Sequence, residues 1–139
     1  MELIANVVQT VESNQNVLFT DTVVCGSASM IHRAGSGLVT LRGITSQCRA
    51  RFKVSFVGNI AIPTGGTVAP ISIAIAIDGE PVAATTMIIT PAAVEEYSNV
   101  FSSVFIDVPR TCCETVSVQN VSGAAILVQN ANLIVERVA

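Results

Sequence analysis

Aromatic and charged residues are scarce in this chain. The 139 residues include no tryptophan, one tyrosine and one histidine, and only 12% are charged. Without tryptophan the chain lacks the usual stacking platform for sugars, and no basic tract accompanies its net charge of −3, which excludes a generally basic nucleic-acid binder. Because this small number of charges cannot cover the whole surface of a small monomer, we expect some of that surface to be buried between subunits.

Long hydrophobic runs are missing as well. Polar residues and glycines interrupt every apolar stretch well before the roughly 18 residues that a membrane-spanning helix requires, so no membrane insertion is expected. The first residues have neither a basic start nor an apolar stretch of signal-peptide length, which argues against export by the usual route. A chain of this length without internal repeats predicts one domain over residues 1–139.

Recognisable motifs for catalysis and metal binding are absent. His32 is the only candidate base, and no serine or cysteine near it in sequence has an orienting acid. The glycines at 35–37 and 65–66 lack the phosphate-loop pattern. The cysteines have no paired C-x-x-C spacing, so we expect no enzyme activity, no metal and no other cofactor. In the absence of an export signal, we expect reduced and mostly buried thiols at Cys25, Cys48, Cys112 and Cys113.

The clearest positive signal is the segment from Ile71 to Ile77. Every second residue there is isoleucine, which is the period of a strand with two unlike faces. Asp78-Gly79 follows directly and predicts a tight hairpin turn, after which residues 82–90 are expected to form the return strand.

The residues between these isoleucines are unusually small. They are Ser72, Ala74 and Ala76. A row that faces solvent would normally carry larger polar side chains. We therefore expect this row to be closely covered by another sheet or by another subunit.

A second alternating segment covers residues 48–60. Its apolar face contrasts with a basic row formed by Arg49, Arg51 and Lys53. This row is either an ordinary solvated face that discourages edge-to-edge aggregation or a docking row for acidic groups such as Glu95 and Glu96.

Similar alternation elsewhere predicts the remaining strands. They fall at 2–11, 16–24, 38–42, 97–108, 114–121, 125–128 and 133–138, with a bulge or bend at 130–132. About eight to ten short strands with no long helix predict an all-β antiparallel sandwich, with the jelly roll as the favoured type.

The segment 1–16 carries more apolar surface than a disordered leader would keep in water. Its apolar residues include Leu3, Ile4 and Val7. The segment is either simply the first strand of the jelly roll or also an anchor that reaches a neighbouring subunit or an underlying lattice.

Two longer stretches resemble a known family. Ile71-Ser-Ile-Ala-Ile-Ala-Ile-Asp-Gly-Glu-Pro-Val82 and Val118-Gln-Asn-Val-Ser-Gly-Ala-Ala-Ile-Leu-Val-Gln-Asn-Ala-Asn-Leu133 are similar to the jelly-roll heads of the tumour-necrosis-factor and complement-head superfamily. Its bacterial branch includes the C-terminal domains of collagen-like spore-surface glycoproteins. The resemblance covers residues 17–138 and implies a ten-stranded head that forms a tight homotrimer.

Shorter stretches resemble structural proteins of phages and prophages of gut Firmicutes. They are residues 37–43 and 135–139. The chain has no Gly-X-Y stalk of the kind that spore-surface glycoproteins carry. We therefore expect a phage head decoration or accessory capsid protein that assembles in the host cytoplasm and sits on the virion surface, with itself and a capsid or other particle protein as partners. The alternatives are a trimeric glycan-binding receptor head or fibre tip and a bacterial spore-surface protein. Candidate interface residues are Ser72, Ala74, Ala76, Arg49, Arg51, Lys53, Leu3, Ile4 and Val7.

Overall fold

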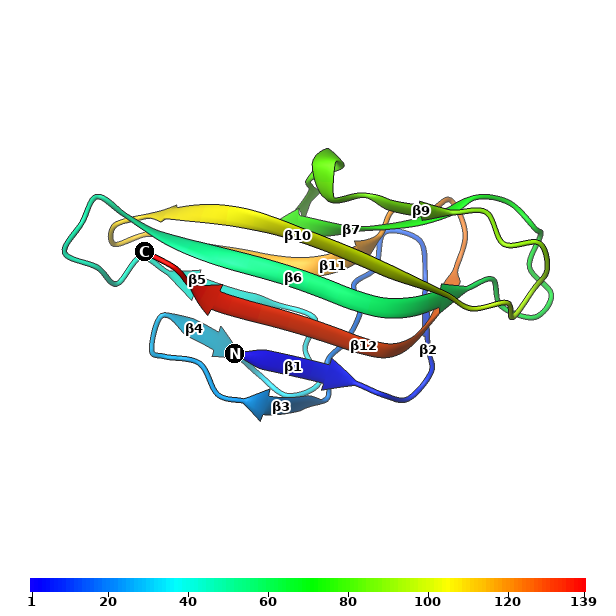
Figure 1. Ribbon diagram of the computed structural model, residues 1–139, viewed down its shortest axis with the longest axis horizontal. Helices are drawn as coiled ribbons and strands as arrows, with labels where there is room; N and C mark the ends of the chain where they lie inside the picture. The colour runs from blue at the N-terminus through cyan, green and yellow to red at the C-terminus, as the bar shows by residue number, and fades with distance from the viewer.

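The computed structural model describes residues 1–139 as two antiparallel sheets packed face to face (Figure 1). The predicted all-β antiparallel sandwich is therefore confirmed. The structure has twelve strands instead of the expected eight to ten, because some expected strands are divided into shorter ones. The single helical element is a three-residue 3-10 turn, Ala83–Thr85, which is far too short to span a bilayer.

The first sheet, called sheet A, follows the order β10-β6-β12-β1-β3, and β2 pairs with one end of β12. Its strands are β1 (Glu2–Ala5), β2 (Gln9–Val11), β3 (Asp21–Val24), β6 (Arg49–Ala61), β10 (Ser98–Pro109) and β12 (Ile126–Arg137). Strands from both ends of the sequence are neighbours in this sheet, because β1 pairs with β12.

The second sheet, called sheet B, follows the order β4-β5-β11-β7-β8, and β9 pairs with β7. Its strands are β4 (Met30–His32), β5 (Val39–Arg42), β7 (Ile71–Ile77), β8 (Glu80–Pro81), β9 (Met87–Ile89) and β11 (Cys113–Asn120). The isoleucines that made β7 so clear in the sequence face sheet A, and Ile73 and Ile75 have no accessible surface.

The core between the sheets is built from alternate residues of the long strands. On β6, Ala50, Phe52, Val54 and Phe56 are wholly buried, while the residues between them are only half-buried. Burying a side chain such as Phe or Val contributes about 1.5–3 kcal/mol. The core cluster has 28 buried apolar residues, which explains how the fold closes without a disulfide.

The predicted turn after β7 is confirmed. Asp78 and Gly79 have φ angles of 52° and 83°, as a two-residue hairpin turn requires. The predicted return strand is interrupted, because the buried Thr85 side chain takes the place of main-chain pairing. Its Oγ1 accepts a hydrogen bond from the Ile75 amide at 3.0 Å and donates one to the Val82 carbonyl at 2.7 Å.

The predicted break at residues 130–132 is confirmed as a bulge. Pairing between β12 and β6 shifts register between Gln129 and Asn132, and Asn130 has a φ of 55°. The two separate strands expected on either side are instead one long strand, because pairing with β6 resumes after the extra residue.

The N-terminal segment belongs to the sandwich. β1 lies between β12 and β3, and Leu3 has no accessible surface. Of the strands expected at 16–24 only β3 forms. Residues before it are held differently, because the Gln9 side chain exchanges two hydrogen bonds of 2.9 Å with the main chain of Leu18 and so acts as a strand partner.

The expectation of mostly buried thiols is wrong. All four cysteines are free and exposed. Cys25 follows the end of β3, Cys48 precedes β6, and Cys112 and Cys113 lie at the turn into β11. Each is therefore at a strand end or in a connection, where the alternation that buries strand residues does not operate.

Candidate functional site

Two aromatic side chains stand on the exposed side of sheet A. Phe101 and Phe105 on β10 are 64% and 62% exposed. The alternation that buries Val100 and Val108 on the same strand turns these two phenylalanines away from the core. Large apolar side chains grouped in this way mark interaction surfaces more often than isolated ones do.

Neighbouring strands extend this apolar surface. Phe101 lies opposite Val57 on β6, Val57 opposite Asn132 on β12, and Asn132 opposite Ile4 on β1. Directly paired residues project to the same side of a sheet, so these four form one row across four strands. Ile134, which is 39% exposed, lies in the next row. We call this surface the outer face, defined by Ile4, Val57, Phe101, Phe105 and Ile134.

One end of the outer face is charged. Asp107 on β10 accepts hydrogen bonds from Arg51 Nε at 2.7 Å and Arg51 Nη2 at 3.0 Å, and Arg49 Nε lies 3.2 Å from the same carboxylate. The Arg51 hydrogen bond holds the pKa of Asp107 below its ordinary value. Lys53 is the next basic residue along β6 and lies opposite Phe105 and Glu136 in the register.

A second apolar surface lies at the opposite edge of sheet A. We call it the N-terminal edge, defined by Val7, Val8, Leu18, Val23 and Val24. All five are exposed, and Val7 reaches 81%. The first three line a shallow hollow of about 210 Å³ together with Ala5, Gln9 and Thr20. β3 is the last strand of the sheet order and β10 the first, so the two apolar surfaces are centred on opposite edges of sheet A. Val24 pairs with Glu2, which also pairs with Ile134, so the N-terminal edge continues the same side of the sheet.

The titratable side chains of the structure are dispersed. No three His, Cys, Asp or Glu side chains converge closely enough to hold a metal ion. The Nε2 of His32 donates to the Ser36 carbonyl at 2.9 Å, so this ring is occupied by a loop contact.

Comparisons with known proteins show the fold. No protein-family model and no curated protein matches the sequence. The globular domain of zebrafish complement 1qA protein is similar in structure, with a TM-score of 0.63, 11% identity and coverage of 96% of this chain and 93% of that chain. Murine APRIL is similar with a TM-score of 0.59, 10% identity and coverage of 95% and 96%. The fold is that of the tumour-necrosis-factor and complement-head jelly roll.

The jelly-roll resemblance drawn from the sequence is thus confirmed at the level of fold. The narrower resemblances, to spore-surface domains and to phage structural proteins, stay predictions. At identities of 10% and 11% these structural neighbours show architecture alone.

The jelly roll brings several predicted interface residues to one surface. Ile4 belongs to the outer face, and Arg49, Arg51 and Lys53 lie at its charged end. Val7 belongs to the N-terminal edge. Glu95, proposed as a partner of the basic row, lies at the other end of the sandwich, where its main-chain amide bonds to Ile62.

Other predicted interface residues are inside the chain, which corrects the prediction for them. Leu3, Ala74 and Ala76 have no accessible surface, so they cannot face another subunit. Leu3 is a core residue of β1. Ala74 and Ala76 are already covered within their own chain, which accounts for their small size. Ser72 is half-buried and held by Ser122, whose Oγ accepts from the Ser72 amide and donates to its carbonyl.

Phe101 and Phe105 were not among the interface residues predicted from the sequence. A signal was present, because both share the parity of Ser103 and Asp107, opposite to that of the valines that mark the core face of β10. The mixed character of that row, with two phenylalanines among polar residues, indicates a surface that is exposed in the chain and suited to contact.

Proposed function

We propose that this chain is a non-enzymatic, homotrimeric jelly-roll protein whose subunits associate through the outer face and the N-terminal edge. The observation that carries the proposal is the pair of exposed phenylalanines, Phe101 and Phe105, on a continuous sheet surface. Burying a phenylalanine contributes about 1.5–3 kcal/mol, so covering both offers a substantial driving force for association. The low share of charged residues, 12%, supports the same conclusion.

The arrangement of the two apolar surfaces supports a ring. A twofold dimer requires one self-complementary surface, whereas two unlike surfaces on one chain suit a heterologous contact that repeats from copy to copy. The most exposed apolar side chains of the outer face lie on β10. The N-terminal edge lies around β3, at the other end of the strand order. A contact of this kind closes when the rotation per copy divides the circle, and three copies fit the tumour-necrosis-factor-like fold.

The proposal extends to the location of the trimer. We propose that it sits on the surface of a particle as a phage head decoration or accessory capsid protein. This part rests on the resemblance to phage structural proteins that the sequence of residues 37–43 and 135–139 suggested. Immunogold electron microscopy of purified particles tests it. Label spread over the head supports decoration, and label at a fibre tip would instead indicate a receptor-binding head.

Native mass spectrometry tests the assembly directly. At micromolar concentration the wild-type chain is expected at three times 14.5 kDa. The double variant Phe101→Ser and Phe105→Ser is expected to be a folded monomer, because both side chains are exposed in the single chain. Ile88→Ser is the matched control, since Ile88 is 66% exposed on β9 of sheet B, away from the outer face.

Two results would contradict the proposal. One is a wild-type chain that remains a 14.5 kDa monomer at these concentrations. The other is a double variant that keeps the trimer mass while Ile88→Ser loses it. Circular dichroism of each variant, with a cooperative melt, shows that a change in mass reflects assembly and not unfolding.

A further inference from the structure

Arginines are concentrated at one end of the sandwich. The β5–β6 loop, the turn between β10 and β11 and the end of β12 lie together at the left of Figure 1. Five of the six arginines lie in or beside these connections. We call this group the arginine end, defined by Arg42, Arg49, Arg51, Arg110 and Arg137. Only Arg33 lies elsewhere, in the β4–β5 connection.

Strand pairing brings these residues together from distant parts of the sequence. Arg42 is the register partner of Cys113, Arg49 is the partner of Pro109, and the Arg110 amide bonds to the Cys48 carbonyl at 3.0 Å. Arg137 joins the group through a 2.7 Å hydrogen bond from its Nη1 to the Ile44 carbonyl. The cluster is therefore fixed by the backbone of four strands.

The carboxylates of the chain leave part of this charge unpaired. Asp107 serves both Arg49 and Arg51, and these are the two ion pairs of the structure. Arg42 and Arg110 are exposed and form no side-chain hydrogen bond or ion pair. Guanidinium groups are suited to paired hydrogen bonds with carboxylates, so two such groups are available to a partner.

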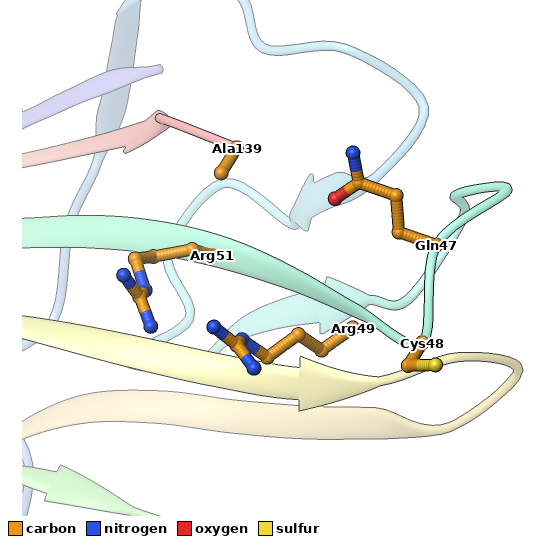
Figure 2. A pocket seen from close by; sticks show the side chains of 5 residues that line it. All are labelled: Gln47, Cys48, Arg49, Arg51 and Ala139. Atoms are coloured by element: carbon orange, nitrogen blue, oxygen red, sulfur yellow. The ribbon is translucent and has the colours of Figure 1, made fainter.

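Two shallow hollows shape the arginine end. One, of about 210 Å³, is lined by Gln47, Cys48, Arg49, Arg51 and Ala139. Figure 2 shows the side chains of Arg49 and Arg51 extending from β6 toward β10. The other, of about 100 Å³, is lined by Arg42, Gly43, Ile44, Thr111, Cys112 and Cys113. Hollows of these sizes fit individual side chains.

We propose that the arginine end is a docking surface for an acidic segment of a partner protein. The proposal rests on the proposed function in one respect, that the partner belongs to the particle which carries the trimer. An acidic protein segment fits better than a nucleic acid for two reasons. The arginine end offers no aromatic side chain for base stacking, and the chain as a whole carries a net charge of −3, which repels a long polyanion beyond the cluster.

The far end of the molecule has the opposite charge. The β2–β3 and β9–β10 connections there carry Glu12, Glu95 and Glu96 and no arginine or lysine. This polarity orients the chain toward an acidic surface, with the arginine end leading and the acidic end pointing away. A second copy docking through its acidic end is the competing occupant.

Fluorescence anisotropy with a labelled ten-residue polyglutamate peptide tests the proposal on the full chain. We expect binding at 50 mM NaCl that weakens strongly at 300 mM NaCl, because exposed charges are screened by salt. The double variant Arg42→Gln and Arg110→Gln is expected to weaken binding about tenfold, as two exposed charge pairs are lost. Arg33→Gln is the matched control and is expected to bind like the wild type.

Several outcomes would overturn the inference. They are no binding by the wild type at 50 mM NaCl, equal weakening by Arg33→Gln, and tighter binding of a ten-nucleotide oligothymidylate than of polyglutamate. A further outcome is salt-sensitive association of trimers into larger assemblies in sedimentation, lost in the double variant Glu95→Gln and Glu96→Gln. That outcome would assign the arginine end to a second copy. Native mass spectrometry of each variant keeps this result separate from the trimer, because Arg42 and Arg110 lie outside the outer face and the N-terminal edge.

Discussion

The Asn120 side chain donates a hydrogen bond of 2.9 Å from its Nδ2 to the main-chain carbonyl of Val11, and both residues are buried. The same amide nitrogen donates to the Ala124 carbonyl at 2.9 Å, and Oδ1 accepts from the Ser122 amide at 2.9 Å. One side chain thus links the end of β2, the end of β11 and the connection that leads into β12. It joins the two sheets at this end of the sandwich.

Asn120→Ala is therefore expected to destabilise the fold by about 3 kcal/mol, because it leaves buried main-chain groups without partners. Urea unfolding measures the loss. Asn99→Ala is the matched control, since the hydrogen bond from Asn99 to Asn59 is exposed, and we expect a change within about 0.5 kcal/mol. Equal effects of the two substitutions would contradict this account of Asn120.

Glu114 and Asp107 are expected to affect stability with opposite dependence on pH. Burial, and then the nearby Asp78 carboxylate, raise the pKa of Glu114 above its ordinary value of 4.5. The fold therefore favours the protonated form, and this contribution is full below pH 4.5 and disappears as the pH rises through the folded pKa. Glu114→Gln should raise the melting temperature at pH 7, with a gain that shrinks as the pH falls toward 4.5.

Asp107 provides the comparison. Arg51 lowers its pKa, so the fold favours the ionised form, and this stabilisation is present above the ordinary value of 3.8 and lost as the pH falls through the folded pKa. Asp107→Asn should lower the melting temperature at pH 7, and the deficit should disappear in acid and decrease in high salt. Melting curves of both variants are measured from pH 3 to 7. If the two melting temperatures, relative to the wild type, change in the same direction with pH, the environments assigned to Glu114 and Asp107 are wrong.

The sequence was sufficient to predict elements whose pattern is local. Alternation in β6 and β7, the Asp78-Gly79 turn and the bulge at Asn130 depend on neighbouring residues, and each was found where expected. The interruption of the return strand was not predictable in this way. It depends on the Thr85 hydroxyl meeting Ile75 main-chain groups across the hairpin.

Predicting the site required knowledge of strand order. The outer face joins Phe101, Val57, Asn132 and Ile4, whose sequence positions say nothing about their adjacency. The same holds for the arginine end, where only Arg49 and Arg51 are close in sequence. The mistaken assignment of Ala74 and Ala76 has a related cause, because small residues in a strand are compatible with cover by the chain itself or by another chain.

The four thiols are expected to report the trimer interface. All are exposed in the single chain, but Cys25 directly follows Val24 of the N-terminal edge. Under native conditions an aromatic disulfide reagent should therefore modify three thiols quickly and one slowly. Cys25→Ser should remove the slow phase, and the monomeric Phe101→Ser and Phe105→Ser variant should convert it to a fast one. Four fast thiols in a wild-type trimer would place the interface elsewhere.

Leu3 and Val7 are only four residues apart and are expected to act on different properties. Leu3 is wholly buried in β1, and Leu3→Ala should cost about 2–5 kcal/mol through lost burial and a cavity. Val7 is 81% exposed, so Val7→Ser should leave the melting temperature of a monomeric background unchanged. In the wild-type background, Val7→Ser should weaken the trimer, and light scattering after dilution measures this effect.

Removing residues 1–11 deletes β1 and β2 together and should yield no soluble protein. Soluble, intact trimers after that deletion would show that the segment is an accessory to the sandwich. A Val7→Ser trimer as resistant to dilution as the wild type would exclude the N-terminal edge from the subunit contact.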